Sequence, residues 1–115
     1  MDAQAVLKVM QGLPGAEEHE GWAGQPAFKV RNKGFAYLSE DETRLMIKAL
    51  REEQHALVAE SPDVYSPSWE GGRFAWLEIT LAAADEEEVT ELITEAWRLT
   101  APKYLLAQLV EVSAD

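Results

Sequence analysis

Alternation of apolar and polar side chains along two short runs constrains the fold of this chain more than any other feature. Phe28 and Val30 alternate with charged residues before Asn32-Lys33-Gly34, and alternation resumes after it. Period-2 alternation is typical of strands with one buried face, and Asn and Gly tolerate the positive φ of a hairpin turn. We therefore predict two antiparallel strands, 27–31 and 34–38, around a turn at 32–34.

Further strands follow from the same pattern. Alternation is longest over residues 73–81 and looser over 44–50, and both segments are predicted as strands. Residues 16–23 are predicted as a short edge strand, whose acidic side chains discourage pairing with other chains. Residues 64–69 contain Pro67 and are predicted as a short strand or an irregular segment.

Three segments have the spacing of helices. Residues 2–11 carry apolar side chains at i, i+3, i+4 and i+7, with Asp2 as the N-cap. A short helix over 52–60 ends before Pro62. The third begins at Asp85, the N-cap of a capping-box spacing, and runs to Pro102, which kinks or restarts it for the final turns.

The predicted order is α-β-β-β-β-α-β-β-α, which is typical of an α+β domain. We expect one antiparallel sheet of about five or six strands, with three helices packed mainly on one face and the other face partly solvated. The chain has 115 residues, of which 47% are hydrophobic, and this length suits a single domain over 1–115.

Composition excludes several classes of function. The chain has no cysteine, so disulfides, thiolate metal sites and cysteine catalysis are ruled out. Its apolar runs are too short for a signal peptide or a membrane span, so we expect a cytoplasmic protein without a membrane partner. His19 lies among glutamates and His55 has Arg51 and Ala59 at i±4, so neither predicts a metal site. No motif marks a nucleophile or a cofactor site, and we expect no enzyme activity and no cofactor.

The chain resembles the MmcQ/YjbR family of small bacterial proteins over roughly residues 10–105. Five segments carry the resemblance: 13–18 (LPGAEE), 24–37 (GQPAFKVRNKGFAY), 61–65 (SPDVY), 73–79 (RFAWLEI) and 95–103 (EAWRLTAPK). The resemblance implies a compact α+β fold similar to that of CyaY and of secretion chaperones. It also implies DNA binding by analogy with a double-wing arrangement, but no catalytic residues.

Charge is distributed unevenly along the chain. The net charge is −11, yet residues 26–51 hold six basic and three acidic side chains, a local charge of +3. The remainder, with four basic and eighteen acidic residues, carries −14. The first functional hypothesis is DNA binding by the basic residues of this region, with the hairpin tracking phosphates. They are Lys29, Arg31, Lys33, Arg44, Lys48 and Arg51.

Three residues of this set, Lys29, Arg31 and Lys33, are two positions apart, so they are expected to share one face of an extended strand. The opposing interpretation is a solvated sheet face whose basic side chains pair with the abundant acids. The second functional hypothesis is a protein- or small-ligand-binding module on the open face of the sheet. Its predicted binding residues are aromatic: Trp22, Tyr65, Trp69 and Trp76.

Overall fold

The computed structural model describes residues 1–21, 25–71 and 74–113. It contains six strands in one antiparallel sheet, ordered β1-β2-β3-β4-β6-β5, which confirms the predicted α+β class. The elements are α1 (Ala3–Gln11), β1 (Ala16–Glu20), β2 (Pro26–Val30), β3 (Lys33–Leu38), β4 (Arg44–Leu50), α2 (Arg51–Glu60), β5 (Tyr65–Gly71), β6 (Phe74–Thr80), the 3₁₀ turn η2 (Leu81–Ala83), α3 (Glu86–Arg98) and α4 (Lys103–Ser113).

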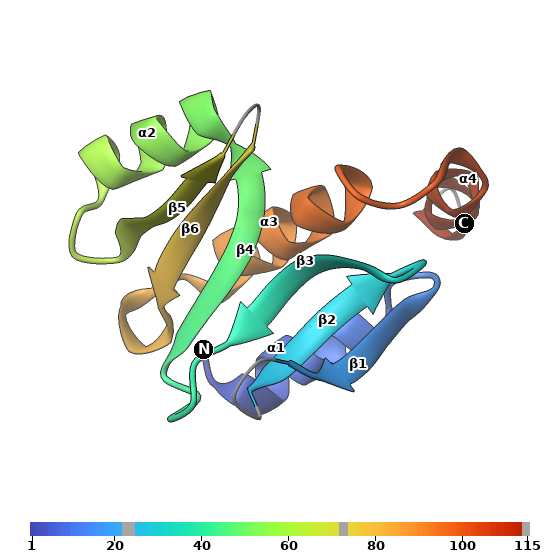
Figure 1. Ribbon diagram of the computed structural model, residues 1–115, viewed down its shortest axis with the longest axis horizontal. Coiled ribbons are helices and arrows are strands. Elements are labelled where there is room, and N and C mark those ends of the chain that lie inside the picture. Colours follow the sequence, from blue (N-terminus) through green and yellow to red (C-terminus); the bar gives the residue numbers. More distant parts are fainter. Residues whose placement is uncertain (22–24, 72–73, 114–115) are drawn as a thin grey trace.

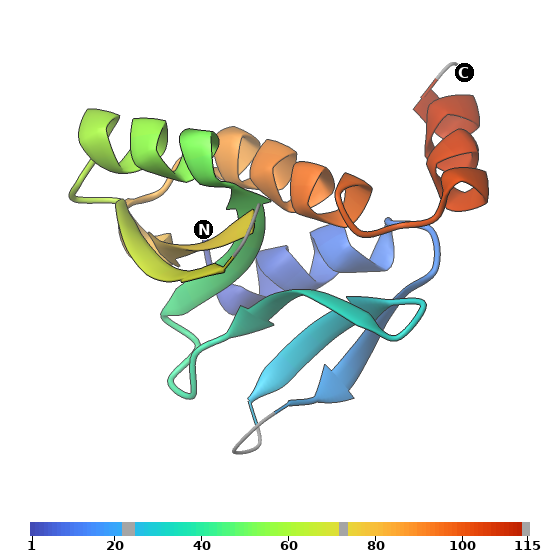
Figure 2. The same ribbon diagram turned by 45° about the horizontal axis from the view of Figure 1, so that its top comes forward.

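Helices α1, α2 and α3 lie on the same side of the sheet, and none of the described helices covers the opposite face (Figures 1 and 2). The core lies between the two layers, where Val6 of α1 and Ile93 of α3 are fully buried with Ile47 of β4 and Leu77 of β6. Alternation in β6 is complete, because Ala75, Leu77 and Ile79 are buried and the intervening residues are half-buried. One face of each central strand therefore stays available at the surface.

The predicted helix starts agree with the observed caps. Asp2 Oδ1 accepts from the Ala5 N–H at 2.9 Å, and Asp85 Oδ2 accepts from the Glu88 N–H at 3.0 Å. The Glu88 carboxylate accepts the phenolic hydrogen of Tyr65, whose ring is buried in the core. This bond ties the first turn of α3 to the edge strand β5.

Pro102 separates α3 from α4, so the described residues form four α-helices where three were predicted. Proline has no N–H to continue the helical ladder, and the chain restarts at Lys103. Helix α4 projects from the helical side at one end of the molecule (Figure 2). Its Leu105 is 6% exposed and lies close to Gly15, which precedes β1.

The β2–β3 turn is tighter than predicted. Val30 pairs directly with Lys33, and the two residues between them, Arg31 and Asn32, have φ values of 52° and 66°. Two consecutive positive φ values are the geometry of a two-residue type I′ turn, which matches the twist of paired strands. The expectation that Lys29, Arg31 and Lys33 share one strand face is therefore wrong, because Arg31 belongs to the turn.

Strand β5 is irregular where it passes Trp76. Pro67 pairs with Leu77 and Glu70 with Ala75, so two residues of β5 lie opposite Trp76 alone. A bulge of this kind disrupts the ladder locally. The side chain of Gln54, fully buried in α2, donates its Nε2 hydrogen to the Trp76 carbonyl at 2.8 Å. Gln54 thus joins α2 to β6 at the bulge, a role that the sequence pattern did not indicate.

Candidate functional site

The helix-free face of the sheet, which we name the open face, is the candidate site. One row of paired residues crosses all six strands on this face: His19, Ala27, Tyr37, Met46, Glu78 and Ser66. The next pair along β4 toward α2 is Lys48 with Trp76, followed by Leu50 with Phe74. Alternation along the strands therefore brings aromatic and basic side chains together on one surface.

An aromatic pair occupies the centre of the open face. The rings of Tyr37 and Trp76 have centroids 5.3 Å apart and an interplanar angle of 49°, within the range of favourable tilted contacts. Met46 lies on the strand between them and is only 7% exposed. Tyr37 and Trp76 themselves remain half-buried, so part of each ring is available for contact.

Two half-buried lysines flank the aromatic pair. Lys48 Nζ lies 5.2 Å from the centroid of the Phe74 ring, a cation–π distance. Burial, and secondarily the positive charge of Lys33, lower the pKa of the Lys48 ammonium. Lys29 lies on β2 two residues from Ala27 and faces the same side. Within residues 1–21, 25–71 and 74–113, neither Lys29 nor Lys48 forms an ion pair.

The remaining predicted basic residues are dispersed. Arg44 Nη1 lies 3.4 Å from Glu78 Oε1, so this charge is offset within the open face. The Arg31 guanidinium lies 6.0 Å from the Tyr104 ring of α4. Arg51 begins α2 at the opposite end of β4 from Arg44, and Lys33 is exposed beside the hairpin turn. Arg31 and Arg44 therefore lie beyond opposite ends of β3, each against a residue outside this set.

The aromatic residues predicted to bind a ligand lie in different environments. Trp76 lies on the open face, as the alternation of 73–81 indicated. Tyr65 is 2% exposed and belongs to the core, because it pairs with the inward-facing Ile79. Burial and the hydrogen bond to Glu88 raise the pKa of the Tyr65 phenol. Trp22 and the side chain of Trp69 lie outside the described part of the structure.

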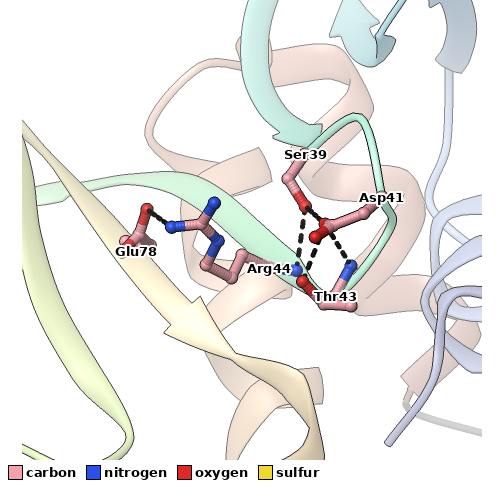
Figure 3. A network of polar contacts seen from close by, with 5 residues as sticks. All are labelled: Ser39, Asp41, Thr43, Arg44 and Glu78. Atoms are coloured by element: carbon pink, nitrogen blue, oxygen red, sulfur yellow. Dashed lines mark hydrogen bonds and ion pairs between the residues drawn. The ribbon is translucent and has the colours of Figure 1, made fainter.

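A network in the β3–β4 turn borders the open face (Figure 3). Asp41 Oδ1 accepts from the Ser39 hydroxyl at 2.7 Å, from the Thr43 hydroxyl at 2.7 Å and from the Thr43 N–H at 3.1 Å. The Ser39 Oγ in turn accepts from the Arg44 N–H at 3.0 Å. These hydrogen bonds, with Thr43 contributing most, lower the pKa of the Asp41 carboxyl from 3.8 to about 2.

The lowered pKa of Asp41 predicts a specific effect of acid. Its contribution to stability is complete above the unfolded-state pKa of 3.8 and is lost as the pH falls toward about 2. We expect Asp41→Asn to destabilise the protein at pH 7 and the difference from wild type to shrink between pH 4 and 2. Urea unfolding across this range measures the effect. Asp63→Asn, at an exposed aspartate outside the network, is the control; an equal pH dependence for both variants would contradict the assignment.

Shallow recesses border the open face. One of about 330 Å³ is lined by Gly21, Gln25, Ala27, Lys29 and Tyr37, and we name it the Lys29 recess. A second of about 460 Å³ is lined by Gln25, Ser39, Glu40, Asp41 and Arg44. Gln25 lines both, so the two adjoin. Gln25, Met46 and Phe74 were not among the predicted site residues. The alternation of residues 73–81 could have identified Phe74, because it puts Phe74 on the same face as Trp76. Nothing in the sequence marked Gln25.

Residues 1–21, 25–71 and 74–113 contain no group of three His, Asp or Glu side chains arranged to hold a metal ion. His19 Nε2 lies 3.9 Å from Glu17 Oε2 on the edge strand β1. None of the described helices is both long and apolar enough to span a membrane.

Comparison with known proteins agrees with the fold. The structure of the Deinococcus radiodurans protein DR2400, described as a DUF419 domain, superposes with a TM-score of 0.76. It is 22% identical in sequence, and the match covers 85% of this chain and 77% of that chain. No curated protein matches. The YjbR family model matches residues 11–99, most of the chain, which therefore belongs to the YjbR family.

Proposed function

We propose that this protein is a binding module that holds a small anionic ligand on the open face of its sheet. The observation that supports this function is the Tyr37–Trp76 pair, flanked on the same face by Lys29 and Lys48. Aromatic rings offer apolar contact to a ligand, and half-buried ammonium groups attract its charge. The opposite layer has a different character, since α3 exposes Glu87, Glu91 and Glu95.

Burial strengthens the case for an anionic ligand. An ammonium group on a partly apolar surface loses hydration, as the lowered pKa of Lys48 indicates. A bound anion would supply the missing charge partner at short range. At long range the net charge of −11 repels anions, so binding is expected to depend on contacts within the site rather than on electrostatic steering.

NMR titration of ¹⁵N-labelled protein tests the proposal. Phenyl phosphate is expected to shift the backbone amides of the open face, especially at Tyr37, Lys48 and Trp76, and to leave those of α3 unchanged. Trp76→Leu is expected to weaken binding by about tenfold, through loss of ring contact. Tyr104→Ala removes a 53% exposed aromatic ring from α4 and is the matched control. Absence of open-face shifts at millimolar phenyl phosphate would overturn the proposal.

Nucleic acid is the second candidate, because lysines beside exposed rings are also the pattern of surfaces that stack bases and contact phosphates. A thymidine oligonucleotide and a DNA duplex belong in the same titration. Nucleic-acid binding predicts affinity that falls steeply with salt and is lost in the Lys29→Glu/Arg31→Glu double variant. Binding of phenyl phosphate that is insensitive to moderate salt, with no response to either DNA, would reject this candidate.

A further inference from the structure

We propose that the Lys29 recess receives the oxyanion of an aryl phosphate or aryl carboxylate, with the single ring of the ligand against Tyr37. This inference rests on the proposed function and adds the position and chemical class of the ligand. The recess has a volume of about 330 Å³, near the lower end of the range for small-molecule sites. One ring with one anionic group therefore suits it better than a larger molecule.

Lys29 provides the cation of the recess. Its register neighbours are Glu17 on β1 and Gly34 on β3. Glu17 is exposed, and its Oε2 lies 3.9 Å from His19 Nε2. It forms no ion pair with Lys29 in the described structure. Gly34 has no side chain, and a Cβ built there would meet no atom within 4 Å. In the described structure, therefore, neither register neighbour of Lys29 holds its ammonium in an ion pair.

Gly21 and Gln25 both line the recess. The Gly21 N–H donates to the Gln25 carbonyl at 2.6 Å, so these two residues are joined through their backbones. A Cβ at Gly21 would lie 2.9 Å from the Gln25 carbonyl oxygen and 3.0 Å from the Ala27 Cβ, so a larger residue does not fit without a backbone shift. The Gln25 side chain carries an amide that can donate hydrogen bonds to an oxyanion without adding charge.

Tyr37 forms the aromatic wall of the recess. Its ring contacts Trp76 at a centroid distance of 5.3 Å, and this contact restricts the orientation of the phenol. A ligand ring that packs on Tyr37 would extend the aromatic cluster across β2 and β3. The anionic group and the ring of the ligand then have separate partners, Lys29 and Tyr37.

The other recesses lack this combination. The recess at Arg44 also contains Glu40 and Asp41, and the Arg44 guanidinium pairs with Glu78. A recess of about 740 Å³ on α3 is lined by three glutamates, which repel anions. The recess between α2 and β5, about 610 Å³, is lined by His55, Val58, Ala59, Pro67 and Ser68. It offers no lysine or arginine among its described lining residues.

Isothermal titration with three probes tests the assignment. Phenyl phosphate combines both groups, inorganic phosphate has only the anion, and benzyl alcohol has only the ring. We expect phenyl phosphate to bind at least about fivefold more tightly than either fragment. Benzoate in place of phenyl phosphate identifies which oxyanion is preferred. Equal affinity for phenyl phosphate and inorganic phosphate would overturn the role of the ring.

Variants distinguish failure of this assignment from failure of the proposed function. Lys29→Gln is expected to weaken phenyl phosphate binding about fivefold or more, the effect of losing one partly buried charge contact. Lys8→Gln, at an exposed lysine of α1 on the helical side of the sheet, is the control and should change affinity less than twofold. If open-face amides shift but Lys29→Gln binds like wild type, the Lys29 recess is wrong and the proposed function stands. If no open-face amide shifts, both fail.

Discussion

Replacement of Trp97 by alanine is expected to lower the free energy of unfolding by about 4 kcal/mol, the largest effect of any substitution considered in this protein. Trp97 is fully buried and is among the largest core side chains. It lies on the inward face of α3 with Ile93 and Val89, against the sheet. Its removal leaves a cavity between the layers that the neighbouring strands cannot fill without distortion.

Hydrogen bonding adds to the loss at Trp97. The indole Nε1 donates to the Pro14 carbonyl at 2.9 Å, which fixes the segment between α1 and β1 on the end of α3. Trp97→Phe keeps most of the ring volume but leaves this carbonyl without its partner, so we expect a smaller loss of about 1–2 kcal/mol. The comparison separates packing from the hydrogen bond.

Urea unfolding monitored by far-ultraviolet circular dichroism measures both variants. Tyr104→Ala removes an exposed aromatic residue and is expected to change stability by less than about 0.5 kcal/mol. A cost below about 1 kcal/mol for Trp97→Ala would contradict the structural role assigned to this side chain. Near-wild-type m values are required for the comparison, because a changed m value indicates a changed denatured or native state.

Local pattern was sufficient to predict most of the fold. The stripe that contains Val89, Ile93 and Trp97 has helical spacing, and it faces the core as expected. The alternation of residues 73–81 correctly assigned Leu77 and Ile79 to one face and Trp76 to the other. In these elements hydrophobic periodicity and burial have the same cause, since each has one side against a single core.

The alternation of apolar and polar residues did not predict the geometry of the β2–β3 turn or the bulge in β5. The sequence Arg31-Asn32-Lys33-Gly34 allows more than one turn register, and the chain adopts the one in which Val30 pairs with Lys33. The choice depends on the pairing of whole strands rather than on the turn residues alone. Gln54 is another example, because its partner exists only where β5 bulges opposite Trp76.

The candidate site on the open face could be predicted only in part, because it also depends on how the strands pair. The strand face on which Lys29 and Lys48 lie could be derived from the alternation in their own strands. Their position around Tyr37 and Trp76, however, depends on the strand order β2-β3-β4-β6. Residue type alone did not predict the location of Tyr65. This aromatic residue was predicted to line a binding surface, but its pairing with Ile79 places it in the core. Charge counting likewise could not reveal that Arg44 lies against Glu78.

Gly15→Ala is expected to lower the free energy of unfolding by about 2–3 kcal/mol. Gly15 has a φ of 70°, where a residue with a Cβ costs about 1–2 kcal/mol. A Cβ there would also lie 2.8 Å from Leu105 Cδ1, so the Leu105 side chain must leave its present position. A displaced rotamer adds about 0.5–1.5 kcal/mol. Gly15 therefore controls both the entry into β1 and the packing of α4.

Two variants separate these contributions. Gly34→Ala is the matched control. A Cβ at position 34 would meet no atom within 4 Å, so the free energy of unfolding of this variant should not fall. Leu105→Ala in the Gly15→Ala background relieves the contact but not the backbone strain, so the double variant should be more stable than the sum of the two single losses predicts. Additive losses in this cycle would show that the backbone conformation alone makes glycine necessary at position 15, and that α4 does not depend on this close approach.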